Sequence, residues 1–311
     1  MRKLLYIIAF IVPCATYGQH QFHQSQYMHH HYFVNPAAVA TFNSTNIAGF
    51  YKNQWTGFTG APTIQGVSIG GPFSGYNAGW GAQIIHDKIG VNNTWDISGT
   101  YAYKVQLSNN WKLGLGLSGV LHMTQSNFAE VETTIAGDPM FQESTPMVVM
   151  PNFRFGAYAY SSKSFVGLAI PNLLRNQIVT EGGAKGQTSF DASDMHMYIH
   201  AGTELEMSRD VTMTPSILFK HVSGTPLQFD VNVDSEFQEK VGVGISYRSS
   251  GEFIMRASYN VSEEFLVGYS YDLSFGDIGL FSGGSHEIML RYKIRTSINE
   301  DEPKTKSRID I

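Results

Sequence analysis

Hydrophobic and polar residues alternate one by one along much of the chain. Examples are "MYIHAGTELEM" (197–207), "LQFDVNVD" (227–234), "KVGVGISYR" (240–248), "FLVGYSYD" (265–272) and "HEIMLRYKI" (286–294). A period of two predicts β-strands with one apolar and one polar face. The predicted strands are each about 9 to 12 residues long, the length of a tilted strand that crosses a bilayer.

The same reading gives fourteen candidate strands, an even number as a closed up-and-down barrel requires. Their approximate centres are Ala48, Val67, Ala82, Tyr101, Leu117, Phe155, Gly167, Ala201, Ile217, Phe229, Val243, Met255, Val267 and Leu290. We therefore predict an all-β fold, a transmembrane antiparallel β-barrel.

Connection lengths support a barrel over a secreted β-sandwich, which is the alternative. The long connections, roughly Thr124–Thr145, Pro171–Asp194 and Phe275–Gly283, follow the fifth, seventh and thirteenth strands. Short ones such as "SNN" and "SRD" follow even-numbered strands, although those after the ninth and eleventh are short too. Outer-membrane barrels place short turns at the periplasmic rim and long loops outside.

Composition agrees with this class. Charged residues make up 15% of the chain and aromatic residues 13%, and there are 31 glycines, whereas a soluble domain has about 25% charged residues. No stretch after the N-terminus approaches the length of a transmembrane helix. The formal net charge of −5, with no basic cluster, argues against a nucleic-acid partner.

The chain begins with the layout of a secretory signal peptide, residues 1–18. Two cations precede the apolar run Leu4 to Val12, and small and polar residues lead to cleavage after Gly18. Lipoprotein processing at Cys14 is the rival, but the preceding "IVP" lacks small residues. Cys14 is the single cysteine, so the mature chain has no disulfide or thiolate chemistry.

The remaining chain divides into three parts. Residues 19–43 form an N-terminal segment expected in the lumen or the periplasm, 44–295 the barrel, and 296–311 a polar periplasmic tail. The N-terminal segment holds a histidine cluster: His20, His23, His29, His30 and His31. Imidazoles bind zinc or copper, but no carboxylate lies among them, so a polar plug is the favoured interpretation.

Catalytic chemistry has little support. His86 and Asp87 are adjacent, but neighbouring strand residues point to opposite faces. "GLGLSG" (114–119) spells a dinucleotide motif but has no helix after it, so we read its glycines as allowing close packing or curvature. We predict no enzyme activity, no cofactor and no metal site.

Charged residues fall on the polar faces of several strands. The acidic ones are Glu204, Glu206, Asp230, Asp234 and Asp272, and the basic ones are Arg248, Arg256, Arg291 and Lys293. Rings of charge tune pores, but the mixture of signs favours a filled or plugged lumen.

The stretch "YKNQWTGFTGAP" (51–62) follows the first strand. Trp55 and Phe58 suit the headgroup level of a membrane, and Gly57 and Gly60 suit a tight rim turn. Direct partner binding is the alternative role.

Several motifs in order resemble the PorP/SprF family of type IX secretion. They are "SQYM" (25–28), "NPA" (35–37), "YKNQWTGFTGAPTIQ" (51–65), "HDKIG" (86–90), "GDPMF" (137–141), "PNFRFGAYAYS" (151–161) and "VGLAIPNLL" (166–174). The family-motif positions, structural or partner-binding, are Gln26, Tyr27, Met28, Asn35, Pro36, Gln54, Trp55, Gly57, Gly60, Pro62, Asp87, Lys88, Gly90, Pro151, Asn152 and Phe153.

The resemblance implies an outer-membrane barrel of about fourteen strands in a Gram-negative-type cell. It implies an accessory role in delivering or anchoring specific cargo, such as gliding adhesins, at the cell surface. The implied partners are outer-membrane lipid, components of the type IX machine, and the adhesin or its C-terminal signal domain. A passive or fatty-acid-type channel is the alternative function.

Overall fold

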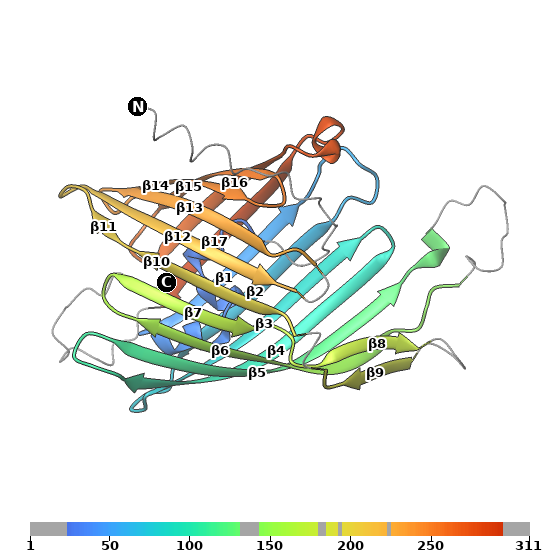
Figure 1. The fold of residues 1–311 in the computed structure, drawn as a ribbon, viewed down its shortest axis with the longest axis horizontal. Helices are drawn as coiled ribbons and strands as arrows, with labels where there is room; N and C mark the ends of the chain where they lie inside the picture. The colour runs from blue at the N-terminus through green and yellow to red at the C-terminus, as the bar shows by residue number, and fades with distance from the viewer. Residues whose placement is uncertain (1–23, 131–142, 180–184, 192–194, 223–224, 295–311) are drawn as a thin grey trace.

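The computed structural model describes residues 24–130, 143–179, 185–191, 195–222 and 225–294 of the chain. Within these ranges, fourteen antiparallel strands form one closed β-barrel (Figure 1). The strands that close it are β1 (Thr45–Asn53), β2 (Thr63–Pro72), β3 (Ala78–Ile89), β4 (Asn92–Gln106), β5 (Lys112–Ser126), β6 (Val148–Tyr160), β7 (Ser164–Ile170), β10 (Met197–Thr203), β12 (Val211–His221), β13 (Gln228–Phe237), β14 (Val241–Arg248), β15 (Glu252–Asn260), β16 (Phe265–Ser274) and β17 (Ser285–Ile294).

Each strand pairs with its neighbour in the chain, and the first pairs with the last. Thr45 of β1 lies opposite Ile294 of β17, and Met197 of β10 lies opposite His221 of β12. Every described wall strand therefore has two partners. The barrel has no open edge whose backbone N–H and C=O groups would lie in lipid without hydrogen bonds. The barrel predicted from alternation is confirmed, and each predicted centre falls in a different strand.

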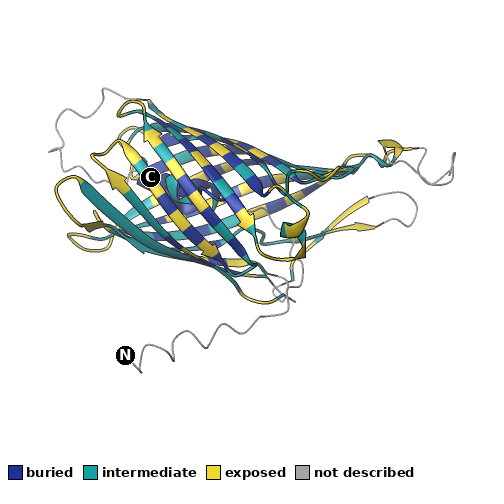
Figure 2. Cartoon of the chain, turned by 90° about the horizontal axis from the view of Figure 1, so that it is seen from above, coloured by how far each residue is buried: buried dark blue, intermediate teal, exposed yellow. Residues whose placement is uncertain are grey.

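Alternation of burial explains why these sequences form a barrel wall. In β17, Glu287 and Met289 are buried, whereas Ile288 and Leu290 are 51% and 46% exposed. The checkered pattern recurs around the wall (Figure 2). Apolar side chains point outward toward lipid and polar side chains point into the lumen, the inverse of a soluble protein.

The two rims differ as the connection lengths predicted. One rim, here called the long-loop rim, carries the connections 127–147, 171–196 and 275–284. Two of these hold short 3-10 helices, η5 (Phe128–Glu130) and η8 (Asp277–Leu280). The third holds a hairpin of β8 (Arg175–Val179) and β9 (Lys185–Ser189), which forms a sheet of its own and projects beyond the barrel (Figures 1 and 2).

The opposite rim, the short-turn rim, is made of brief turns. Glu206 was expected on the lumen-facing side with Glu204, and its register agrees with this. β10 ends at Thr203, and a two-residue strand, β11 (Leu205–Glu206), continues the pairing with β12 in the same register, with Glu206 opposite Thr212. At this rim the Glu206 side chain is 57% exposed and pairs with Lys163 at 3.2 Å.

Residues 24–43, here called the plug, run through the inside of the barrel. They form three 3-10 helices, η2 (Tyr27–His29), η3 (His31–Phe33) and η4 (Pro36–Thr41). Asn35 begins η4, because its side-chain oxygen accepts the Ala37 N–H at 3.0 Å and Pro36 occupies the first helical position. In the described part of the chain, no helix has the length and apolar character needed to cross a membrane.

Candidate functional site

The plug begins near the long-loop rim and ends near the short-turn rim. The carbonyl of Gln24 lies by Arg248, the last residue of β14, next to the β14–β15 turn of the long-loop rim. The other end passes through η4, where the Ala40 carbonyl accepts from Tyr160, the last residue of β6 on the short-turn side. The plug therefore threads the lumen from one mouth to the other before the chain enters β1.

On one side of the lumen, several wall residues that face η4 are glycines, which have no side chains. A Cβ added to Gly116 would lie 2.5 Å from the Ala37 nitrogen, and one added to Gly114 would lie 2.7 Å from the Ala37 oxygen. At Gly156 it would lie 2.9 Å from the same nitrogen. These distances are below any normal contact, so only glycine lets the wall approach the plug backbone. The glycines of "GLGLSG" thus have a packing role at 114 and 116.

Asn35 ties the same stretch to the wall. Its amide nitrogen donates to the carbonyls of Ala157 and Leu168, both at 3.1 Å, and lies 3.1 Å from Nε2 of His200. The residue is fully buried. Its oxygen caps η4, so one side chain links two strands to the helix start.

Aromatic rings and histidines fill the space beside Asn35. The Nδ1 atom of His31 is 2.7 Å from the Tyr158 hydroxyl, and the His31 ring packs against Phe165 with 4.6 Å between ring centres. A Cβ at Gly167 would lie 2.0 Å from His200 Nε2, so this glycine makes room for the His200 ring.

Neutral histidines fit these surroundings. Burial, together with the nearby positive charges of Arg291 and Lys293, lowers the pKa of His30 to about 3. The Nε2 atom of His30 is 2.8 Å from Ser68 Oγ, and the ring packs against Phe33 and Phe42. The described histidines of the plug therefore act as packed, uncharged rings. Among the described residues, no group of three or more histidine, cysteine or acidic side chains could hold a metal ion, and His20 and His23 lie outside them.

The other side of the lumen holds the plug with charges. Glu287 Oε2 accepts from the Ser25 N–H at 2.7 Å, and its Oε1 accepts from the Gln26 N–H at 3.1 Å. Lys52 Nζ lies 2.7 Å from both Asp272 Oδ2 and Ser25 Oγ. All of these groups are buried, so each charge requires its partners.

Two arginines extend this network along β14 and β15. Arg248 binds both oxygens of Asp230, at 3.0 and 3.1 Å, and Glu252 at 2.7 Å. Arg256 binds both oxygens of Asp234, each at 3.0 Å. A mixed-sign lumen was predicted. The charged lumen residues that the prediction missed include Lys52, Asp96, Arg154, Lys220 and Glu252. Lys52 carried a usable signal, since it sits in phase with the inward positions of β1.

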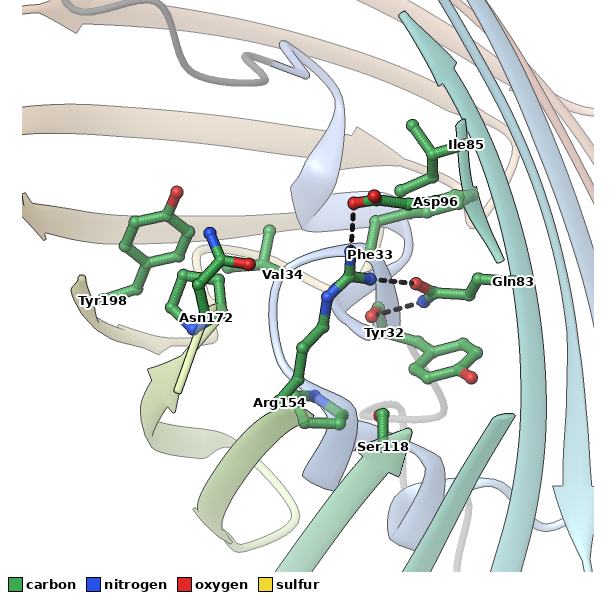
Figure 3. A pocket seen from close by; sticks show the side chains of 12 residues that line it. Tyr32, Phe33, Val34, Gln83, Ile85, Asp96, Ser118, Arg154, Asn172 and Tyr198 are labelled. Atoms are coloured by element: carbon green, nitrogen blue, oxygen red, sulfur yellow. Dashed lines mark hydrogen bonds and ion pairs between the residues drawn. The ribbon is translucent and has the colours of Figure 1, made fainter. Parts of the chain in front are cut away.

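A small pocket of about 100 Å³ lies on the long-loop side of the plug (Figure 3). Arg154 crosses it and binds Asp96 at 2.6 Å and Gln83 at 3.4 Å, while Gln83 donates to the Tyr32 carbonyl at 2.7 Å. Phe33, Val34 and Tyr198 supply apolar lining. This arrangement binds the plug to β3 and β6.

A larger cavity of about 770 Å³ lies on the other side of the plug. Met28 and His29 of the plug form part of its lining, together with charged residues of the short turns such as Lys163, Arg209 and Glu263. The plug thus has a cavity on each side of it, the larger one toward the short-turn rim.

The family-motif residues fall into three places. Gln26, Tyr27, Met28, Asn35 and Pro36 belong to the plug, and the Tyr27 hydroxyl accepts from Asn232 at 2.7 Å. Pro151 and Phe153 face outward on β6, whereas Asn152 faces inward. The Asn152 side chain bonds the main chain of Leu174 at 2.9 and 3.0 Å, which fixes the start of the long loop after β7.

The third group forms the long-loop rim beside β1. Gln54 N–H donates to the Pro62 carbonyl at 2.9 Å, and Trp55, Gly57 and Gly60 have φ angles of 46°, 107° and 78°. Only glycine adopts the last two without strain. Thr56 exchanges main-chain bonds with 283–284 at 2.7 and 2.8 Å.

The Gly90 N–H bonds the Gly60 carbonyl at 2.9 Å. The loop therefore joins the connections that precede β17 and follow β3. Asp87 and Lys88 flank this junction on β3, and Lys88 lies 3.8 Å from Glu130. Placement of Trp55 and Phe58 at the headgroup level stays a prediction.

His86 and Asp87 do not form a relay. The His86 ring faces outward and stacks on Trp95 with 4.0 Å between ring centres, and its Nδ1 lies 3.0 Å from Gln65. Asp87 lies on the opposite face, as the period of a strand requires.

Fold and lumen together define a class: a membrane β-barrel whose lumen is occupied by its own N-terminal segment. Residues 16–292 match the family model described as type IX secretion system membrane protein PorP/SprF, and the chain belongs to this family. Barrel and family place the protein in the outer membrane. The family is a secretion-system membrane protein rather than an enzyme class.

The other comparisons give only distant similarities. No curated protein matches the chain. A solved structure of the CymD monoaromatic hydrocarbon channel is similar with a TM-score of 0.48 and 11% identity, covering 88% of this chain and 94% of that one. A Pseudomonas aeruginosa FadL homologue gives a TM-score of 0.47 and 10% identity, with 85% and 93% covered. Acinetobacter baumannii Omp33 gives 0.45 and 9%, with 82% and 100% covered. No function follows from these.

Proposed function

We propose that this protein is an accessory of type IX secretion that helps deliver or anchor specific cargo at the cell surface. Its partners are outer-membrane lipid, components of the secretion machine, and a secreted adhesin or its C-terminal signal domain. Membership of the PorP/SprF family supports the secretion role.

The observation that carries the proposal is the occupied lumen. A barrel whose interior is filled by residues 24–43, held by buried charges on one side and by glycine contacts on the other, is built as a scaffold. The working surfaces are then the rims. The long-loop rim, with the β8–β9 hairpin projecting from it, is the surface we assign to cargo.

A passive channel is the competing function. It needs a continuous water path, and a ring of one charge sign is a common means of ion selection. The described lumen charges instead pair with each other, as in Arg248 with Asp230 at 3.0 Å. This pairing favours a scaffold.

The proposal is tested by the surface and secreted proteome of a strain that lacks the gene. Complementing strains carry either the unchanged chain or a chain in which β8–β9 is replaced by a short turn. That hairpin pairs only with itself among the described strands, so its loss leaves the wall intact. We expect one or a few proteins with type IX C-terminal domains to vanish from the surface in the deletion strain and to return with the unchanged chain. Normal delivery of every such protein in the deletion strain would contradict the proposal.

A further inference from the structure

The first described residues of the plug are held mainly through their main chain. The Glu287 carboxylate accepts from two consecutive amides, Ser25 N–H at 2.7 Å and Gln26 N–H at 3.1 Å. Such charge-assisted bonds are about twice as strong as neutral ones. They are also independent of the side chains that the bound segment carries.

Two arginines meet the carbonyls of the same residues. Arg248 Nη2 donates to the Gln24 carbonyl at 3.4 Å, and Arg256 Nη1 donates to the Ser25 carbonyl at 3.5 Å. These contacts are long, and they set the direction of the segment more than its affinity. Three strands, β14, β15 and β17, thus supply donors and acceptors to one short segment that bends at Ser25.

Side-chain recognition is limited to two positions. Ser25 Oγ donates to Asp272 Oδ2 at 2.6 Å and accepts from Lys52 Nζ at 2.7 Å. Gln26 Nε2 donates to the Glu287 carbonyl at 3.2 Å. A Cβ on Gly268 would lie 2.2 Å from Gln26 Oε1, so this glycine leaves the space that the Gln26 side chain fills.

The wall groups are pre-arranged by pairing among themselves. Lys52 pairs with Asp272 at 2.7 Å, Arg248 with Glu252 at 2.7 Å, and both bonds are independent of the plug. Glu287 differs, because within the described residues its carboxylate accepts hydrogen bonds from plug amides alone. If the segment leaves, this carboxylate needs other N–H donors.

The position of the site decides from which side it is reached. Arg248 ends β14, and Glu287 is the third residue of β17, so both lie at the long-loop end of the barrel. Gln24 is 3% exposed, yet neither atom of its side-chain amide has a hydrogen-bond partner among the described residues. The site therefore contacts the main chain of Gln24 and forms no hydrogen bond with its side chain among the described residues.

We propose that Lys52, Arg248, Arg256, Asp272 and Glu287, here called the Glu287 cradle, form a peptide-binding site at the long-loop mouth. Its ligand is a polypeptide segment with a small hydroxyl residue at the Ser25 position. The chain's own Gln24–Gln26 occupies it, and a segment of a second polypeptide entering from the long-loop rim can replace them.

The first test asks whether the two amides hold the segment. Cys14 is the one cysteine of the chain, so Gln24→Cys places one new thiol in the plug. We expect this thiol to react slowly with a maleimide in the folded protein. Replacing Ser25 and Gln26 by proline removes both donors to Glu287, and we expect the rate of labelling to rise at least tenfold. Unchanged protection in the proline variant, with heat-modifiable mobility showing a folded barrel, would overturn the proposal.

The second test uses a labelled synthetic peptide of residues 20–26, because the variant's own residues 27–43 still occupy the rest of the lumen, and fluorescence anisotropy in detergent. We expect saturable binding to the full-length proline variant and at least tenfold weaker binding to the unchanged chain, whose own segment competes. N-methylation of the two peptide amides, or Glu287→Gln in the protein, should weaken binding at least tenfold. Glu206→Gln, at the exposed short-turn rim, is the control that also removes one carboxylate, and it should leave binding unchanged. Equal binding of the N-methylated peptide, or no saturable binding, would overturn the proposal.

Discussion

The two sides of the lumen hold the same plug by opposite means. On the side of β5 and β6, glycines such as Gly116 and Gly156 remove side chains, so the plug backbone fits directly against the wall. On the side of β1, β16 and β17, long charged side chains such as Lys52 and Glu287 reach into the lumen to meet the plug. The first side depends on shape and fails when volume is added. The second depends on charge pairing and fails when one partner is removed.

The largest effect is expected on the charged side from Lys52→Met. This change leaves Asp272 buried without its cation, and removal of one partner of a buried pair costs about 3–5 kcal/mol. The double variant Lys52→Met, Asp272→Asn should recover most of the loss, since the neutral amide still has an oxygen for Ser25 Oγ. Unfolding by denaturant in detergent measures both. A single variant as stable as the unchanged chain would show that the pair does not hold the plug.

On the glycine side we expect the reverse response, in which added volume is harmful. Gly116→Val forces the wall into the Ala37 backbone and should cost up to about 3 kcal/mol, as overpacking does. Gly119→Val is the matched control on the same strand, since a Cβ there has nothing within 4 Å. If both variants behave alike in stability and in bilayer conductance, the close fit is not what retains the plug.

Acid should weaken the plug where its histidines pack. His30 has a pKa lowered to about 3 when bound, against about 6.5 for a free histidine. Below pH 6.5 His30 is protonated in the released plug but stays neutral in the bound plug. The free energy that holds the plug therefore falls by about 1.4 kcal/mol per pH unit, or about 2 kcal/mol at pH 5. Stability measured from pH 7 to pH 5 should fall, and His30→Phe should flatten the curve. A loss of stability between pH 7 and pH 5 that is as large in His30→Phe as in the unchanged chain would contradict the packing described here.

The smallest effect is expected outside the lumen. Lys163 and Glu206 pair at 3.2 Å, but both are more than half exposed. Exposed pairs contribute less than about 1 kcal/mol. Glu206→Gln should therefore leave the unfolding midpoint nearly unchanged, and a large shift would mean that the short-turn rim matters as much as the lumen.

The barrel was predictable because its cause is local. In a strand between lipid and lumen, apolar and polar residues alternate, so "LQFDVNVD" shows which residues face the lipid and which face the lumen. The role of Gly114 and Gly116 in close packing was also predictable from their place in a strand.

The plug contacts were beyond sequence reasoning for a different reason. Ser25 meets Glu287 across 262 positions of the chain, and Gly116 meets Ala37 across the lumen. Alternation says that Glu287 points inward but not what it meets. The β8–β9 hairpin was missed too, because "RNQIV" and "KGQTS" lack the apolar face that marks a wall strand.

The measurement that tests the central claim most directly is the conductance of the purified, full-length protein in planar lipid bilayers. A scaffold with an occupied lumen is expected to insert without producing steady current, while Gly116→Val, with its plug displaced, is expected to conduct. Steady, ohmic single-channel current from the unchanged chain would contradict the claim and make the protein a channel.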